Sequence, residues 1–228
     1  MRELALRSGC PNACRHCSVD GRPPYGALYS LDELHELAAQ WGSLIYLQEP
    51  TAHPEFPELL DPAVSGEEYA SGSVPTCGFG IARREDHASL LGRLGELGFS
   101  ELSFTLHGLR DHHDWFARRR GAFDDVLAAT HRALACGFTI RWQIYVDGRG
   151  LHDVIPSVRR ALRETGKPPA IGIPFHRITA RLWRYEKLRP TLADIRERGL
   201  DRLSEKVRGK AAVINKGGKS FQAFGWMV

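Results

Sequence analysis

The chain has 228 residues, of which 43% are apolar and 25% are charged, and this is the composition of a soluble globular protein. The balance excludes collagen-like, coiled-coil and mostly disordered chains, and no run reaches the ~18 consecutive apolar residues that a membrane helix needs. The net charge of +4 is the small difference between 31 basic and 27 acidic residues, so we expect a surface of mixed charge.

The N-terminal part of the chain predicts a strand, a loop and a helix in that order. Its first residues show no long apolar segment before a cleavage site, so we expect no signal peptide and a cytoplasmic location. A short strand is expected over residues 2–8. After the loop, the sequence SLDE predicts a helix that begins at Ser30, because Ser30 and Glu33 form a capping box. Gly42 is expected to end this helix.

Strands and helices alternate along the rest of the chain. The run SLIYLQ at residues 43–48 is almost wholly apolar, which is typical of a strand buried on both faces. Further strands are expected over residues 74–79, 101–106, 139–146 and 170–175. Further helices are expected over residues 56–64, 86–97, 122–136, 151–165 and 191–205. Such alternation indicates a parallel sheet with right-handed crossovers.

The number of these units, about six, predicts an α/β fold of the partial (β/α)6 TIM-like barrel type, with parallel strands in a single domain. We place the barrel core in residues 1–207. Residues 208–228 are rich in glycine and end in an apolar run, so we expect them to form a short C-terminal extension. In such barrels the reacting groups lie at the carboxyl ends of the strands.

Three of the five cysteines, Cys10, Cys14 and Cys17, lie in the sequence CPNACRHC directly after the first expected strand. An odd number of cysteines without a signal peptide argues against a disulfide framework. Three thiolates on one loop can bind three irons of a 4Fe–4S cluster and leave the fourth iron open. The alternative is a zinc site that includes His16, but His16 adjoins Cys17, and zinc ligands usually come in pairs separated by a longer loop.

The cysteine loop resembles that of the radical S-adenosylmethionine (SAM) superfamily, in which an aromatic residue takes the place of His16. The sequence QEPTAHPEF at residues 48–56 is similar to the superfamily's G-E-P-T-x-H-P-x-F segment at the end of the second strand, with Gln48 in place of the usual glycine. Residues 106–123 are similar to its fourth-strand region. Together the matches cover roughly residues 4–180.

The resemblance implies a 4Fe–4S cluster on the three cysteines and SAM bound at its open iron. The backbone and carboxylate around Glu49 would accept hydrogen bonds from the SAM amino group. Thr105 and an arginine of residues 118–120 would contact the SAM carboxylate, Gln143 and Tyr145 would reach the ribose from one strand face, and Gly172 would leave room for adenine. These assignments to SAM comprise His16, Gln48, Glu49, Pro50, Thr51, Thr105, Arg118, Arg119, Gln143, Tyr145 and Gly172.

Several of these residues also have an interpretation without SAM. Glu49 can be a solvated strand end, Thr105 an ordinary β-branched strand residue, and residues 118–120 a solvated basic turn. His107 and His176 fall near strand ends, where a contact with substrate is plausible.

Cys77 lies at the end of the third expected strand, in the sequence VPTCGF, where relatives often have T-N-G. A thiol at this end of a strand can return a hydrogen atom to a substrate radical, as in some radical SAM epimerases, or bind a substrate or second metal. The alternative is a small buried residue that packs like alanine. Cys136, at the end of an expected helix on the outside of the barrel, is the contrast and is expected to be inert.

The sequence therefore predicts a radical SAM enzyme that cleaves SAM reductively to a 5′-deoxyadenosyl radical and abstracts hydrogen from a small-molecule or small-peptide biosynthetic substrate. We expect an electron donor such as flavodoxin or ferredoxin, no membrane association, and no auxiliary-cluster or cobalamin domain. The alternative is a catalytically inactive iron–sulfur or zinc module that contacts nucleic acid through the arginine-rich C-terminal region. Sparse aromatic residues and interspersed acids there argue against a nucleic-acid partner.

Overall fold

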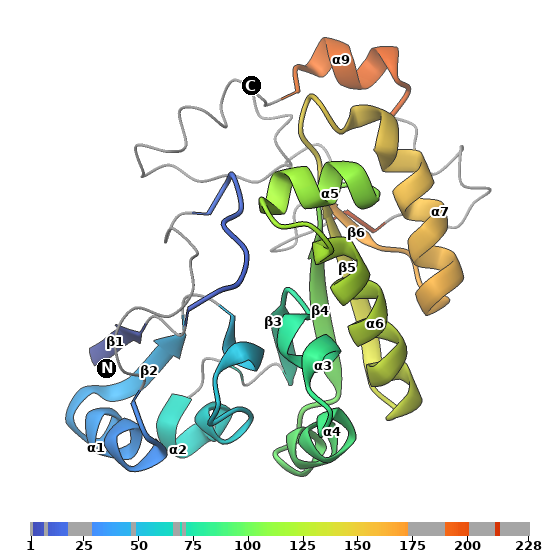
Figure 1. Ribbon diagram of the computed structural model, residues 1–228. Coiled ribbons are helices and arrows are strands. Elements are labelled where there is room, and N and C mark those ends of the chain that lie inside the picture. The colour runs from blue at the N-terminus through green and yellow to red at the C-terminus, as the bar shows by residue number, and fades with distance from the viewer. Residues whose placement is uncertain are drawn as a thin grey trace. The chain divides into compact units, whose positions relative to one another are not determined.

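The computed structural model describes residues 2–6, 9–17, 29–46, 49–65, 69, 72–172, 190–200 and 213–214. Figure 1 shows the order of the elements along the chain. The strands are β1 Arg2–Leu6, β2 Gly42–Tyr46, β3 Ser73–Thr76, β4 Glu101–Leu106, β5 Thr139–Tyr145, β6 Ala170–Gly172 and β7 Val213–Ile214. The α-helices are α1 Leu31–Trp41, α2 Pro62–Ser65, α3 Phe79–Arg83, α4 His87–Glu96, α5 Arg110–Ala117, α6 Ala122–Ala135, α7 Val154–Thr165 and α9 Leu192–Glu197. Three short 3-10 helices are η1 Pro50–Ala52, η2 Glu58–Leu60 and η3 Leu151–Asp153.

The described strands form two sheets. One contains β1 and β2, and the other has the order β3-β4-β5-β6-β7. The pairs β1–β2, β3–β4, β5–β6 and β6–β7 are parallel, which confirms the predicted parallel α/β arrangement. In the β5–β6 pair, Tyr145 lies opposite Gly172, so these two predicted site residues are neighbours across the strands.

The chain forms two compact units that interleave along the sequence. The first comprises residues 1–13, 19–104 and 124–140, and the second comprises residues 14–18, 105–123 and 141–228. The predicted boundary between residues 207 and 208 lies outside the described residues and stays a prediction. Strand β7 lies in the expected extension and pairs with β6, so at least this part of the extension adds to the sheet.

In the first unit, local sequence signals determine where helix α1 begins and ends. The Ser30 side chain accepts a hydrogen bond from the Glu33 N–H, and the Glu33 carboxylate accepts one from the Ser30 N–H, which confirms the predicted capping box. Gly42, at a φ of 95°, ends the helix as expected, because a left-handed backbone suits glycine. The apolar face of α1 packs against β1, β2 and α2.

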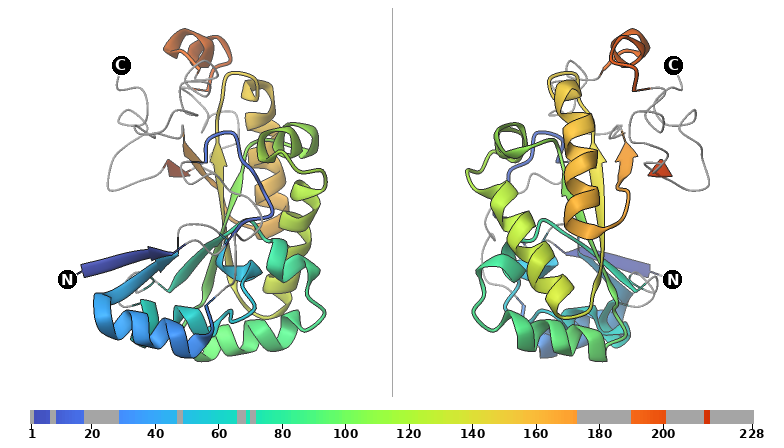
Figure 2. Two further views of the ribbon diagram at one scale, coloured as in Figure 1. Left: turned by 60° about the vertical axis from the view of Figure 1, so that its left-hand side comes forward. Right: turned by 90° about the vertical axis from the view of Figure 1, so that its right-hand side faces the viewer.

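In the second unit, burial alternates along β5, with Trp142 and Ile144 buried. Figure 2 shows α7 lying along β5 and β6, and its buried face contains Val154, Val158 and Ala161. Among the described residues there is no helix with the length and apolar character of a membrane span.

Several observed elements differ from the predicted ones; for example, β3 ends at Thr76, although a strand was expected as far as residue 79. The helix expected over residues 56–64 is divided into η2 and α2, because proline lacks a backbone N–H and interrupts regular helix. Helices α3 and α5 were not predicted. The missed signal for α5 is the spacing of its buried residues, His112, His113, Phe116 and Ala117, which lie on one helical face.

Candidate functional site

The three cysteines of the motif lie on one loop, residues 9–17, that follows β1 and contains neither helix nor strand. Cys10, Cys14 and Cys17 are each partly buried. The Cys17 N–H donates a hydrogen bond to the Cys14 carbonyl at 3.0 Å, and the Glu49 N–H donates to the Gly9 carbonyl at 3.0 Å. The second bond ties the start of the cysteine loop to the Glu49 segment within the first unit.

The donor set consists of three thiols on one loop, which is the donor chemistry of a 4Fe–4S cluster. Within the part of the chain that the structure describes, no three Cys, His, Asp or Glu side chains are grouped so that they could hold one ion. In a four-iron cube each thiolate binds a different iron, so the three ligands need not converge on one point. The chemistry of three thiols on one loop therefore agrees with the predicted cluster, and the ligand assignment stays a prediction.

Glu49 is the centre of a buried hydrogen-bond network in the first unit. Only 2% of the residue is exposed. Its Oε1 accepts from the Thr51 N–H at 3.2 Å and from the hydroxyls of Thr51 and Thr76, each at 2.5 Å. Its Oε2 accepts from the Cys77 N–H. The carboxylate thus joins η1 to the end of β3, and most of its acceptor capacity is used inside the protein.

Cys77 lies at the end of β3, as the sequence predicts, and beside the first cysteine of the motif. A hydrogen bond between the thiols of Cys77 and Cys10, together with desolvation and the neighbouring Glu49 carboxylate, raises the pKa of Cys77 well above its usual value. The thiol is therefore protonated at neutral pH and can donate a hydrogen bond.

The approach of helix α3 to η1 requires a glycine. A Cβ placed on Gly80 would lie 1.7 Å from the Thr51 carbonyl oxygen, so no other residue fits without moving one of the two segments. Gly78 begins α3 in the left-handed conformation, and its N–H donates to the Thr76 hydroxyl at 2.9 Å. The sequence PTCGFG at residues 75–80 thus builds the strand end on which the Glu49 network depends.

In the second unit, three ring side chains gather around His16. The His16 ring centroid lies 4.8 Å from that of His107, 5.3 Å from that of Phe116 and 5.7 Å from that of Tyr145. His107 also stacks on Phe116 at 3.9 Å. The structure therefore brings together His16 and Tyr145, both assigned to SAM from the sequence, and adds His107 and Phe116, which were not.

His107 has the features of a ligand-binding group. The residue is 3% exposed, and its Nδ1 has no hydrogen-bond partner among the described residues. Burial, with the neighbouring histidines His16, His113 and His112, lowers the pKa of His107 well below its usual value, so the ring is neutral. A buried polar atom without a partner beside aromatic rings suits a ligand that combines a flat ring with hydrogen-bonding groups, such as an adenosyl group.

His113, on α5, holds His107 in position. The His107 N–H donates a hydrogen bond to Nδ1 of His113 at 3.2 Å, and His113 is buried. Burial, as the largest cause, lowers the pKa of His113 to about 4. His113 is therefore neutral at physiological pH, which keeps its Nδ1 available as an acceptor.

The remaining predicted SAM contacts are placed as follows. The Gln143 Nε2 donates to the Tyr145 hydroxyl at 2.9 Å, which confirms that these two side chains share a strand face. Thr105 is partly buried on β4. Arg118 is exposed and ends α5 at a φ of 54°, whereas Arg119 is partly buried. Pro50 and Thr51 are buried in η1. Gln48 and His176 lie outside the described residues.

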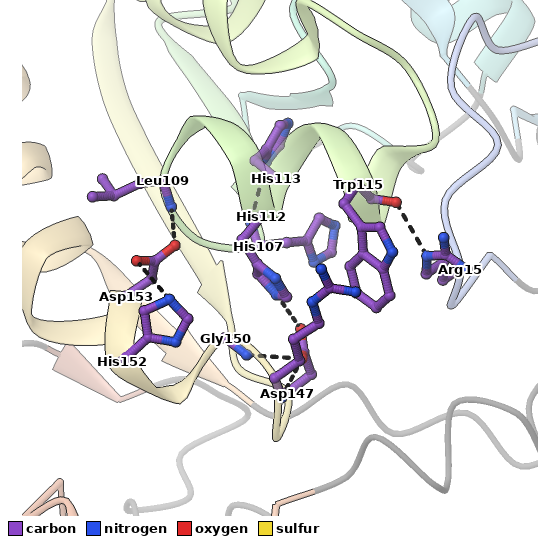
Figure 3. A network of polar contacts seen from close by, with 11 residues as sticks. Arg15, His107, Leu109, His112, His113, Trp115, Asp147, Gly150, His152 and Asp153 are labelled. Carbon is purple, nitrogen blue, oxygen red and sulfur yellow. Dashed lines mark hydrogen bonds and ion pairs between the residues drawn. The ribbon is translucent and has the colours of Figure 1, made fainter.

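Sequence reasoning missed a polar network beside this ring cluster, which Figure 3 shows. His112 on α5 forms a hydrogen bond with Asp147 after β5, with 2.7 Å between Nε2 and Oδ2. Asp147 also accepts from the N–H groups of Arg149 and Gly150. A Cβ on Gly150 would lie 2.5 Å from His112 Nε2, so glycine is required there. The pair was not evident because its members are 35 residues apart in the sequence.

Comparison with known proteins gives matches over most of the chain. The family model of the radical SAM superfamily matches residues 6–156. Fe-coproporphyrin III synthase of Methanosarcina barkeri (strain Fusaro / DSM 804) is 27% identical over 166 residues, which are 70% of this chain and 40% of that protein.

Two solved structures share the fold. Native anSMEcpe with bound AdoMet superposes with a TM-score of 0.59 at 15% identity, covering 93% of this chain and 63% of that chain. Native anSMEcpe with bound AdoMet and Cp18Cys peptide gives 0.58 at 15% identity, over 93% and 62%. The likeness confirms the predicted partial TIM-like barrel. The chain spans about two fifths of the synthase and less than two thirds of the solved relatives.

Proposed function

Because the chain belongs to the radical SAM superfamily, whose cofactors are a 4Fe–4S cluster and SAM, we propose that it cleaves SAM reductively. When bound, the reduced cluster supplies one electron to SAM, which yields methionine and a 5′-deoxyadenosyl radical that removes a hydrogen atom from the substrate. The observation that carries the proposal is the C-x3-C-x2-C loop beside the His16, His107 and Tyr145 rings. Cys10, Cys14 and Cys17 would hold the cluster.

The protein residues have distinct parts in this proposal. The rings of His16, His107 and Tyr145 would flank the adenosyl group and shield it from water, with the neutral His107 Nδ1 as its hydrogen-bond partner. Gly172, opposite Tyr145, would leave room for adenine, and Gln143 would reach the ribose. Removing water protects a reactive radical from side reactions.

Glu49 would act mainly by positioning its segment. Its carboxylate already accepts hydrogen bonds from Thr51, Thr76 and Cys77, so little capacity remains for the SAM amino group. We therefore assign the acceptors for this amino group chiefly to the backbone carbonyls of residues 48–50. Thr105 and Arg118 or Arg119 remain the proposed contacts of the SAM carboxylate.

We propose a small-molecule or small-peptide substrate and a one-electron donor of the flavodoxin or ferredoxin class, in the cytoplasm. The peptide held by one of the solved relatives supports the small-peptide option for this chain. The alternative, an inactive iron–sulfur or zinc module on nucleic acid, is not favoured, because the family match extends through the barrel and beyond the cysteine loop.

The proposal is tested on protein purified and reconstituted without oxygen. We expect about four irons per chain, and dithionite is expected to drive release of 5′-deoxyadenosine and methionine from SAM. Alanine at Cys10, Cys14 or Cys17 should abolish both, whereas the exposed Cys136 provides the matched control and its Cys136→Ala variant should keep both. Stoichiometric zinc without iron, or a cluster that never cleaves SAM, would contradict the proposal.

A further inference from the structure

A group of arginines surrounds Trp115 in the second unit. The Arg15 Cζ lies 4.0 Å from the centre of a Trp115 ring, and the Arg149 Cζ lies 4.0 Å from one as well. The Arg15 Nε also donates to the Trp115 carbonyl at 3.1 Å, and Figure 3 shows Arg15 beside this residue. Stacking on an aromatic face holds a guanidinium flat and fixes its position, so these two side chains are preorganised.

These charges are held together without a compensating acid. Arg15 and Arg149 both lie on the Trp115 side chain, and Arg118 follows at the end of the same helix, α5. None of the three forms an ion pair with a described residue. Like charges that lie close together repel one another, so an anion bound beside them would relieve the repulsion.

Two nearby carboxylates, those of Asp114 and Asp147, are already engaged elsewhere. Asp114 accepts hydrogen bonds from the N–H groups of Gly121 and Phe123. Asp147 is paired with His112 and accepts from the backbone N–H of Arg149, so it does not neutralise the Arg149 guanidinium. The positive charge around Trp115 is therefore available to an external anion.

The arginine group continues into a pocket of about 450 Å³, of which Arg149 is a lining residue. The other lining residues are Leu109, Arg110, Asp111, His112, His152 and Asp153. The Asp153 carboxylate accepts from the Leu109 N–H at 3.0 Å and lies 3.4 Å from His152, so it too is engaged. A pocket of this size takes a small molecule or a few residues of a peptide.

We propose that Arg15 and Arg149, which both lie on Trp115 and of which Arg149 lines this pocket, bind an anionic group of the substrate, a carboxylate or a phosphate. Guanidiniums match both groups because their planar N–H pairs donate two parallel hydrogen bonds. Arg15 lies between two cysteines of the motif, so a substrate anchored there is held next to the cysteine loop. The inference that an anion binds here rests on this geometry alone. The assignment of that anion to the substrate rests on the proposed function.

The test measures binding to the cluster-loaded chain by isothermal titration calorimetry, with succinate and inorganic phosphate as probes at low ionic strength. We expect Arg149→Gln and Arg15→Gln each to weaken the preferred probe at least ~10-fold, as the loss of one charge-assisted hydrogen bond predicts. The tighter probe identifies the chemical class. Arg159→Gln removes an exposed arginine on α7 of the same unit and is expected to bind like the parent.

Arg149 is exposed, so its variant is expected to fold even if Arg15→Gln does not. The affinity of the Arg149→Gln variant for SAM, measured separately, should equal that of the parent. Parent protein that binds neither probe, or Arg149→Gln that binds both like the parent, would overturn the proposal. A fall in SAM affinity with unchanged probe binding would assign these arginines to the SAM carboxylate instead. Failure of SAM cleavage would overturn the proposed function without changing the result of this titration.

Discussion

Glu49 shows that one buried carboxylate can connect segments that the sequence leaves apart. It receives hydrogen bonds from η1 and from the end of β3, and it lies next to the contact between Cys77 and Cys10. A residue selected from the sequence as a SAM contact is thus also a structural link in the first unit.

Replacement of Glu49 by alanine should therefore reduce stability as well as SAM affinity. The buried N–H groups of Thr51 and Cys77 would lose their acceptor, which should cost about 3 kcal/mol or more in the free energy of unfolding. Urea denaturation measures this, and Glu36→Ala, at an exposed position of α1, is the control. Normal stability of Glu49→Ala with reduced SAM affinity would show that Glu49 acts on SAM directly.

Cys77 allows a second prediction at this scale. Its thiol contacts that of Cys10, so Cys77→Ala removes a hydrogen-bond donor from a proposed cluster ligand. Since hydrogen bonds to ligand sulfurs raise the potential of iron–sulfur clusters, the midpoint potential should become more negative. Potentiometric titration followed by electron paramagnetic resonance measures the shift, with Cys136→Ala as the control. The hydrogen-donor hypothesis predicts instead that Cys77→Ala cleaves SAM normally but gives an altered product. If the variant has the same midpoint potential and the same product as the parent, Cys77 only packs in the core.

At the scale of elements, the close approach of α3 to η1 positions the Glu49 segment. Only a hydrogen atom fits between Gly80 and the Thr51 carbonyl oxygen, whereas a Cβ on Gly92 in helix α4 would meet nothing within 4 Å. The two helical glycines therefore have opposite expected responses to alanine.

Gly80→Ala should lower the free energy of unfolding by about 3 kcal/mol or more, because the added methyl group forces η1 and α3 apart. Gly92→Ala should raise it by up to about 1 kcal/mol, since alanine favours helix. Thermal denaturation of both variants tests the contact. A Gly80→Ala protein as stable as Gly92→Ala would mean that α3 does not approach η1 this closely.

The stability of the whole molecule should depend on pH through its buried histidines. His113 has a pKa of about 4 when folded and about 6.5 when unfolded, so the unfolded chain binds more protons below pH 6.5. The contribution of His113 to the free energy of unfolding is then fully present above pH 6.5 and falls as the pH decreases toward 4. From neutral pH to about pH 5 the loss should be about 2 kcal/mol for this residue.

Urea denaturation across this pH range measures the effect. His113→Gln should reduce the dependence on pH by about that amount, whatever its own stability at neutral pH. His35→Asn, at an exposed position of α1, should retain the parent's dependence. An equal slope in His113→Gln and the parent would show that His113 is not held neutral.

The sequence by itself determined the features that depend on neighbouring residues. The capping box of α1, the glycine that ends it, the alternation of strands and helices, and the cysteine spacing all act over a few residues, so they can be read without knowing the fold. The rule that reacting groups lie at the carboxyl ends of strands also led to Cys77, which directly follows β3 in the structure.

Only the tertiary structure decided which distant residues meet. Arg15 and Trp115 are 100 residues apart, and His112 and Asp147 are 35 apart, so no spacing in the sequence indicates these contacts. They exist because α5, a helix that the sequence pattern did not reveal, packs its buried face within the second unit and turns Trp115 toward the cysteine loop. Pairs that depend on packing between elements have no local signal, and it is these pairs that form the ring cluster and the arginine site.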